Sequence, residues 1–197
     1  ILAGWLWLKE PRRWVIRLGG LALLAVIIQG LLGGLTVLFL LPTAISVSHG
    51  ALAQTFFCLT ICLALFTSKE WQQAPNKIAE AQRPPLQTLT VITTGAIFIQ
   101  LILGAVMRHT KSGLAIPDFP LAFGRIFPPF DSAKIAIHFS HRLGALIVAT
   151  LIIWTAVRII QNYRAEKKLF RPAIFLLCAL LVQLTLGAFI VWTQKDV

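Results

Sequence analysis

Two imidazoles and one guanidinium lie within five residues of each other, near the start of an apolar segment. They belong to His138, His141 and Arg142 in the stretch AKIAIHFSHRLGALIVATLIIW, residues 133–154. An imidazole can ligate a metal, and a guanidinium can bind a carboxylate through two parallel hydrogen bonds. Ionisable groups in a membrane-spanning segment are rare and usually face the bundle interior or a cavity. We therefore expect a functional site in this segment.

His49 occupies a matching position in another apolar segment. It lies six residues after Thr43, and His141 lies six residues after Ile135, so each is about 9 Å along its helix at 1.5 Å per residue. Small residues follow both histidines, and they would let a flat macrocycle approach the helix: Gly50, Ala51, Gly144 and Ala145. A neutral imidazole hydrogen-bonded to a neighbouring helix is one interpretation. Axial ligation of haem iron by His49 and His141 is the other, since metals bound by His alone usually need three or four close ligands.

The remaining candidates have two interpretations each. His138 lies three residues before His141 on the same helix face, so only one of them can ligate a given iron, and we expect His138 to line the site. Arg142 is either an interfacial side chain that reaches toward water or a partner for haem propionates. His109, in the sequence RHTKSG, is either a surface loop residue or a contact at the haem edge.

The elements that position these residues are transmembrane helices. The 197 residues are 57% hydrophobic and 13% charged, against about 25% charged in a soluble domain. Five runs are long enough to cross about 30 Å of hydrocarbon, and continuous apolar runs of this length form helices. They are 16–40, 43–66, 87–107, 135–157 and 172–193. The predicted fold class is an all-α, polytopic integral membrane bundle.

Basic residues predict the orientation of the helices. The net charge is +11, but Lys and Arg lie mostly between apolar runs, where they set topology, so we expect no nucleic-acid partner. Twelve of the 18 Lys and Arg residues fall before or at the start of the first run, or in the second and fourth connections, which we predict to be cytoplasmic. The predicted division is residues 1–68 as one part with two helices, 69–86 as a cytoplasmic connection, and 87–197 as a second part with three helices. The proline-rich loop 108–134 is then external.

A short pattern recurs in alternate runs. QGLLGG (29–34), QLILGA (100–105) and QLTLGA (183–188) share Q-x-x-L-G-[GA]. A helix-packing motif explains each copy, because small residues allow close approach and a glutamine in lipid needs a partner. Recurrence in alternate helices also indicates an internal repeat. The first and third copies are 154 positions apart, so a His corresponding to His49 is expected near position 203, in a helix beyond this sequence.

The three cysteines, Cys58, Cys62 and Cys178, all fall inside apolar runs. Cys58 and Cys62 are four residues apart, a spacing that does not indicate a metal site by itself. We interpret all three as small packing residues, since free Cys is readily buried.

The chain resembles the haem A synthase family of cytochrome oxidase assembly. The matching stretches are QGLLGGLTV, HGALAQ, LGAVMRHTKSGLAIPDFPLAFG and HFSHRLGAL. The resemblance covers the whole sequence and corresponds to the third through seventh helices of an eight-helix enzyme, so we expect a fragment of a longer protein. It implies two pseudo-symmetric four-helix halves, both cut, each with a haem site toward the outer side of a bacterial cytoplasmic membrane.

The resemblance also implies the chemistry and the ligands. Haem O is the substrate, and a ring methyl is oxidised to a formyl group to give haem A, while the second half holds haem b. His49 would be the fourth-helix ligand of the first half, and His141 the sixth-helix ligand of the second. From their residue types and positions, Arg142, His138 and His109 are expected to contact cofactor without ligating it. Implied partners are haem O synthase, an electron donor, the lipid bilayer and a second copy in a homo-oligomer.

The sequence departs from the family pattern at three places. Ile116 and Ala122 stand where the family often has loop cysteines, so no loop disulfide is expected. The family's catalytic Glu belongs to a helix outside this sequence, so no catalytic residue is assigned. His138 stands at the corresponding position of the second half, which we therefore do not expect to oxidise substrate.

Two rival functions remain from the residues alone. A dihaem membrane cytochrome would use the same histidines for electron transfer without modifying haem. A structural or transport bundle without haem would use them as polar packing groups. A haem absorbance spectrum separates the last from the others, and chromatography of extracted pigment separates haem A synthesis from electron transfer.

Overall fold

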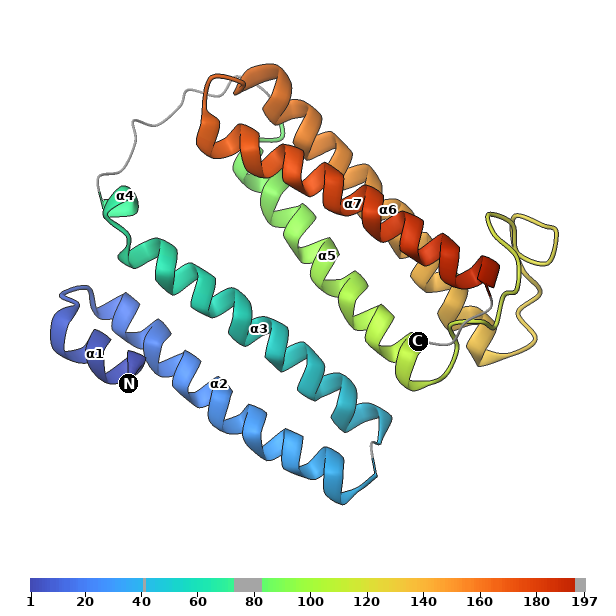
Figure 1. Cartoon of the computed structure of the whole chain (residues 1–197), viewed down its shortest axis with the longest axis horizontal. Coiled ribbons are helices and arrows are strands. Elements are labelled where there is room, and N and C mark those ends of the chain that lie inside the picture. The colour runs from blue at the N-terminus through green and yellow to red at the C-terminus, as the bar shows by residue number, and fades with distance from the viewer. Residues whose placement is uncertain (41, 73–82, 194–197) are drawn as a thin grey trace. The chain divides into compact units, whose positions relative to one another are not determined.

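The computed structural model describes residues 1–40, 42–72 and 83–193 (Figure 1). These residues form seven helices and no β-strand beyond an isolated bridge between Ala122 and Arg125. The helices are α1 (Leu2–Lys9), α2 (Arg13–Leu38), α3 (Thr43–Thr67), α4 (Lys69–Gln72), α5 (Leu86–His109), α6 (Ala133–Asn162) and α7 (Lys167–Thr193). Helices α2, α3, α5, α6 and α7 are long and apolar enough to cross a membrane. The predicted all-α membrane bundle with five spans is confirmed.

The helices extend beyond the apolar runs into polar sequence. α2 begins at Arg13 instead of 16, α6 covers Ala133–Asn162 instead of 135–157, and α7 begins at Lys167 with Pro172 inside it. Backbone hydrogen bonding continues at the membrane boundary, where basic side chains can reach water, so hydropathy marks only the apolar part of each helix. α1 and α4 were not predicted, because neither is long enough to register as a span.

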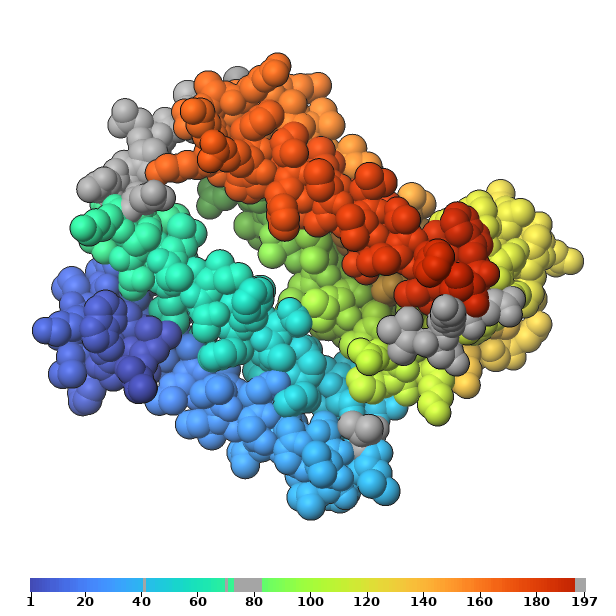
Figure 2. Space-filling view, viewed as in Figure 1, coloured from blue at the N-terminus to red at the C-terminus, as the bar shows by residue number. Residues whose placement is uncertain are grey.

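Two compact units divide the chain: unit 1 is Ile1–Ile78 and unit 2 is Ala79–Val197. The predicted connection 69–86 contains α4 and the start of α5, and its residues 73–82 lie outside the described part. In unit 1, α2 packs along α3 and α1 packs against α2. Figure 2 shows side chains filling the space between the ribbons of α2 and α3.

The core of unit 1 lies toward the α1 end of the α2–α3 pair. Leu6, Val15, Ala22 and Leu63 are buried together, and Leu6 comes from the unpredicted helix α1. Gly19 makes this packing possible, since a Cβ there would lie 2.7 Å from Leu6 Cδ1. α1 is therefore an integral part of unit 1.

Unit 2 is organised around α6, which packs against both α5 and α7. Ala156, Ile159, Tyr163 and Ala173 form its core, with Leu86, Leu169 and Leu177 packed against them. The hydroxyls of Thr93 on α5 and Thr155 on α6 form a buried hydrogen bond of 2.9 Å. This bond satisfies two polar groups that would otherwise be costly in an apolar interior.

The cysteines differ from expectation. All three are free, with Cys58 and Cys178 exposed and Cys62 half-buried. Within the described residues, Cys58 and Cys178 are therefore not buried as predicted: each lies one turn from an exposed apolar side chain on the same helix face, Ile61 and Phe175 respectively.

Candidate functional site

A glutamine and a glycine of α2 contact the imidazole of His49 on α3. Gln29 Nε2 lies 3.4 Å from His49 Nε2. Gly33, one turn further along α2, leaves room for the ring, since a Cβ there would lie 3.2 Å from His49 Cε1. His49 Nδ1 and Gln29 Oε1 are buried and have no hydrogen-bond partner among the described residues. The His49 ring is thus held by Gln29 and Gly33, and its Nδ1 atom remains without a hydrogen-bond partner among the described residues.

The same arrangement recurs in unit 2, between α5 and α6. Gln100 Nε2 lies 3.1 Å from His141 Nδ1 and 3.4 Å from His141 Nε2, and it donates to the backbone oxygen of His141 at 2.9 Å. A Cβ on Gly104 would lie 3.1 Å from His141 Cε1. Gln100 Oε1 is buried and has no hydrogen-bond partner in the described part of the chain.

These contacts explain the first two copies of the recurrent pattern. In each, the glutamine and the glycine four residues later lie on one helix face and receive the histidine of the next long helix. We call this arrangement of Gln29, Gly33 and His49, or of Gln100, Gly104 and His141, the Gln–Gly–His socket. The packing and repeat interpretations of the pattern are therefore compatible. The glutamines were missed as site residues, although their recurrence beside matched histidines was the available signal.

His138 lies apart from the socket and faces the loop between α5 and α6. It is only 3% exposed, the backbone N–H of Ile116 lies 3.1 Å from His138 Nδ1, and Arg142 Nε lies 3.1 Å from His138 Nε2. A neutral imidazole accepts at only one ring nitrogen, so it takes one of these hydrogen bonds at a time. In either case protein donors cover both nitrogens, which leaves neither open to a metal.

Arg142 fastens the loop to α6. Its NH1 group donates to Leu121 O at 2.9 Å and its NH2 group to Ile116 O at 3.2 Å. The Arg142 Cζ atom lies 5.7 Å from the centroid of the Phe119 ring. Figure 1 shows the loop between α5 and α6 folded against the start of α6. Of the five N–H donors of a guanidinium, two remain for another acceptor. The guanidinium therefore has a structural role that the sequence did not predict.

Two further contacts shape the loop. Asp118 accepts hydrogen bonds from the backbone N–H groups of Phe123 at 2.7 Å and Gly124 at 2.8 Å, and Gly124 has a φ of +70° that suits glycine. The bond from Gly124 is the main reason that the pKa of Asp118 lies below its usual value. Trp192 of α7 donates its indole N–H to Phe119 O at 3.3 Å, so the loop is held by two helices.

The positions expected for loop cysteines, Ile116 and Ala122, are both buried, at 0% and 2% exposed. They serve as apolar anchors of the loop. His109 is the last residue of α5 and is half-buried. It lies nine residues after Gln100, about 13 Å further along the helix axis, so it is not part of the socket.

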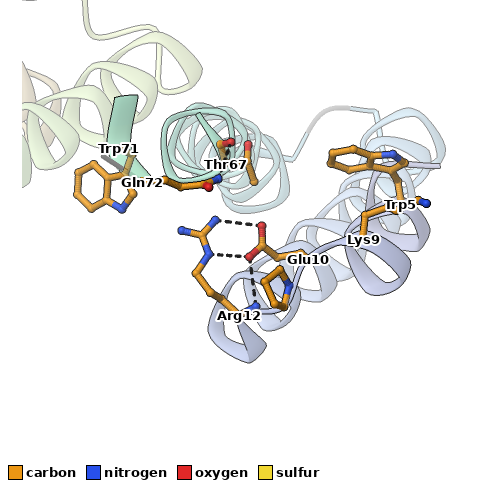
Figure 3. Close-up of a pocket in the computed structure, with 8 residues that line it drawn as sticks. Trp5, Lys9, Glu10, Arg12, Thr67, Trp71 and Gln72 are labelled. Carbon is orange, nitrogen blue, oxygen red and sulfur yellow. Dashed lines mark hydrogen bonds and ion pairs between the residues drawn. The ribbon is translucent and has the colours of Figure 1, made fainter. Parts of the chain in front are cut away.

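A separate cavity of about 670 Å³ lies at the other end of unit 1 (Figure 3). Its lining comes from α1, the α1–α2 connection and the region where α3 ends: Trp5, Lys9, Glu10, Pro11, Arg12, Thr67, Trp71 and Gln72. Arg12 pairs with Glu10 at 2.6 Å, which lowers the pKa of Glu10, and it also donates to Phe66 O at 2.9 Å. Thr67 lies 18 residues after His49, about 27 Å along α3, so this cavity is distinct from the socket.

The described residues contain no group of three or more His, Cys, Asp or Glu side chains that could hold a metal ion. The two candidate axial ligands are instead one per unit: His49 in unit 1 and His141 in unit 2, each in contact with the preceding long helix.

Comparison with known proteins identifies the family of this chain. Residues 1–197 match the COX15-CtaA family, described as cytochrome oxidase assembly protein. A haem A synthase of Halalkalibacterium halodurans is 29% identical over all of this chain and 65% of its own length. One from Listeria welshimeri is 26% identical over 98% of the chain and 62% of its own length, and one from Geobacillus kaustophilus is 24% identical over 87% and 53%. The chain thus spans 53–65% of the length of these relatives, and it belongs to the cytochrome oxidase assembly family that contains the haem A synthases.

Proposed function

We propose that this chain is part of a haem A synthase-like membrane oxidoreductase that converts haem O to haem A by oxidising a ring methyl to a formyl group. The relatives named above are haem A synthases, and the family match covers every residue. The observation that carries the proposal is the recurrence of one imidazole per unit in the same Gln–Gly–His socket. Repetition of a haem-ligand position is what an enzyme with two haem sites requires.

The residues present suit haem. Each imidazole lies beside a glycine that leaves room for it, and His49 Nδ1 is buried with no hydrogen-bond partner among the described residues. His49 and His141 would each supply one axial ligand, with haem O held in the first half and haem b in the second. The iron porphyrin supplies the redox chemistry, while the protein holds the ring and tunes its electronics.

The other candidates have supporting roles in this proposal. His138 is not a ligand, because Ile116 and Arg142 cover its ring nitrogens. Arg142 keeps two N–H donors that suit a haem propionate while it fastens the loop. His109 is proposed to lie near the cofactor edge. The catalytic residue is proposed to be a Glu outside this sequence.

The two units would be the adjoining parts of two four-helix halves. Unit 1 would supply the last two helices of the first half, and unit 2 the first three of the second. We propose that both haem sites lie toward the outer side of a bacterial cytoplasmic membrane, with the loop between α5 and α6 external. Haem O synthase, an electron donor and a second copy of the protein are the proposed protein partners.

Cysteines introduced at Lys77 and Lys111 test the orientation. In intact cells, a membrane-impermeant thiol reagent should label only the cysteine at position 111. Label at position 77 alone would reverse the topology and place both sockets on the cytoplasmic side. The natural cysteines are replaced by Ala in the background strain so that only the introduced thiol reports.

Pigment analysis tests the function. The full-length protein, purified from cells that make haem O, should contain b-type haem and should form haem A that chromatography detects after acid extraction. A b-type spectrum without haem A in any preparation would favour the alternative, a dihaem membrane cytochrome for electron transfer. The absence of any haem spectrum would contradict both.

A further inference from the structure

The sockets contain glutamines to which no role has been assigned. Gln29 and Gln100 come from different units, yet each places its side-chain amide against a ring nitrogen of the candidate haem ligand. The nearest ring nitrogen is Nε2 in His49 and Nδ1 in His141. Each also has a buried Oε1 that lacks a hydrogen-bond partner among the described residues. A buried acceptor without a donor is destabilising, so the recurrence of such an atom in both sockets needs an explanation.

The chemistry of a ligated imidazole provides one. An imidazole that gives one ring nitrogen to a metal carries its proton on the other, and that N–H is normally donated to a nearby acceptor. The terminal torsion of a glutamine is broad and nearly two-fold, so a half turn exchanges the amide N–H groups for the oxygen. Gln29 and Gln100 are the side chains already in contact with the rings. In unit 2 the half turn also gives up the bond from Gln100 Nε2 to the His141 backbone oxygen, so the bond from the ring N–H replaces it.

We propose that Gln29 and Gln100 are positioning residues that accept the ring N–H of His49 and His141 and so set the orientation and basicity of both imidazoles. The inference rests on the proposed haem ligation and extends it to how the ligands are held. An acceptor on the ring N–H makes the imidazole a stronger donor to iron and favours the ferric state, which lowers the reduction potential.

Glycines define the space in which each socket works. A Cβ added to Gly33 would lie 3.2 Å from His49 Cε1, and one added to Gly104 would lie 3.1 Å from His141 Cε1. In unit 2, a further glycine, Gly144, leaves room for the glutamine, because a Cβ there would overlap Gln100 Oε1. The far end of Gln100 is flexible, so a methyl group at position 144 should push the amide away from His141 without changing either residue.

The experiment measures the haem held by His141 in the purified full-length protein, using haem content per protein, midpoint potential and the electron paramagnetic resonance of the ferric haem. Gln100→Leu should raise the potential and weaken haem retention on the order of 10-fold, as loss of an outer partner of a metal ligand does. Gln100→Glu, which can only accept, should keep the haem and shift the potential in the opposite direction. Gly144→Ala should reproduce the Leu variant's shift.

Matched controls come from the same helix. Gln87 is exposed on α5, so Gln87→Leu repeats the chemical change away from His141. Gly95, also on α5, has nothing within 4 Å of an added Cβ, so Gly95→Ala controls for a methyl group on this helix. Both should leave the potential and the resonance signal unchanged.

The outcomes separate this inference from the proposed function. If His141→Ala loses the haem while Gln100→Leu, Gln100→Glu and Gly144→Ala all match the controls, ligation stands and the positioning role is wrong. Shifts of the same sign for Gln100→Leu and Gln100→Glu also overturn it, because a packing role does not depend on acceptor strength. If His141→Ala keeps the haem and its signal, the ligand assignment itself fails.

Discussion

The two units hold equivalent sockets but enclose them differently. In both, a glutamine and a glycine of one helix receive the imidazole of the next long helix, with an added glycine Cβ 3.2 or 3.1 Å from the ring. Only Gln100 also reaches the backbone oxygen of its histidine. Gly144 leaves room for that contact, whereas unit 1 has Leu52 at the corresponding position three residues after His49.

The larger difference lies in the residues on either side of the histidine, three positions before it and one after it. Unit 2 has His138 and Arg142 beside His141, and both bind the long loop between α5 and α6. The corresponding residues around His49 are Ser46 and Gly50, and Ser46 Oγ is buried with no partner in the described residues. The socket is therefore the repeated element, while the polar contacts of His138 and Arg142 with the loop occur in unit 2.

Removing the imidazoles should have the largest effect. In the full-length protein, His141→Ala should deplete the b-type haem, because one remaining axial ligand holds iron poorly. His49→Ala should stop haem A formation while leaving the b-type spectrum. His138→Ala should keep most of the haem and shift its potential modestly, since protein donors already cover its ring. Haem per protein and haem A formed, at equal expression, are the measurements.

Two results would contradict the assignment of His49 and His141 as equivalent ligands of the two units. Loss of haem in His138→Ala together with retention of haem in His141→Ala would show that His138, not His141, is the ligand on α6. Full haem content in all three variants would make the imidazoles packing groups, and the sockets would then be helix contacts without a cofactor.

The third copy of the pattern extends the comparison beyond the two units. Gln183 is exposed on α7, and nothing lies within 4 Å of an added Cβ at Gly187. We predict a His within about one helical turn of position 203 in the full-length protein, in a helix that packs on this face. Its substitution by Ala should deplete the same haem as His141→Ala. A full-length sequence without such a histidine would contradict the repeat.

Breaking the loop contact should have an intermediate effect confined to unit 2. Arg142→Ala removes hydrogen bonds to Ile116 O, Leu121 O and His138, and each unsatisfied group costs roughly 1–3 kcal/mol. Trypsin should then cut the loop at Lys111 or Arg125 about tenfold faster or more, since cleavage follows the population of opened loop. Lys134→Ala, at the exposed start of α6, is the control, and equal rates for both variants would show that Arg142 does not fasten the loop.

The smallest expected effect concerns Asp118. Its pKa is lowered in the folded loop, so its hydrogen bonds to Phe123 and Gly124 contribute stability above the unfolded value near 3.8. That contribution is lost as the pH falls below this value and through the lowered folded pKa. The protection of the Phe123 and Gly124 amides in detergent, measured as exchange relative to an unstructured amide at the same pH, should fall over this window in the native protein. Asp118→Asn should exchange faster at neutral pH and show a weaker pH dependence. Identical profiles would remove Asp118 from the loop's structure.

Part of the candidate site was predictable from the sequence. His49 and His141 were paired by depth, because helical rise converts residue counts into distance along the membrane normal. The glutamines were noticed but left as packing residues, because sequence spacing on one helix does not show which side chain of another helix faces it. The role of Arg142 in fastening the loop was likewise missed, since its partners are backbone oxygens and any residue carries one.

An all-α membrane protein with five spans was predictable from the sequence, because hydropathy and length are local properties that the bilayer converts directly into helices. The sequence also carried the repeated pattern that marks the sockets. Only the tertiary structure decided which groups meet: α1 in the core of unit 1, Gln100 beside His141, and His138 under the loop. These pairings depend on helix rotation and close packing, which arise from contacts between distant segments and leave no periodic signal in the chain.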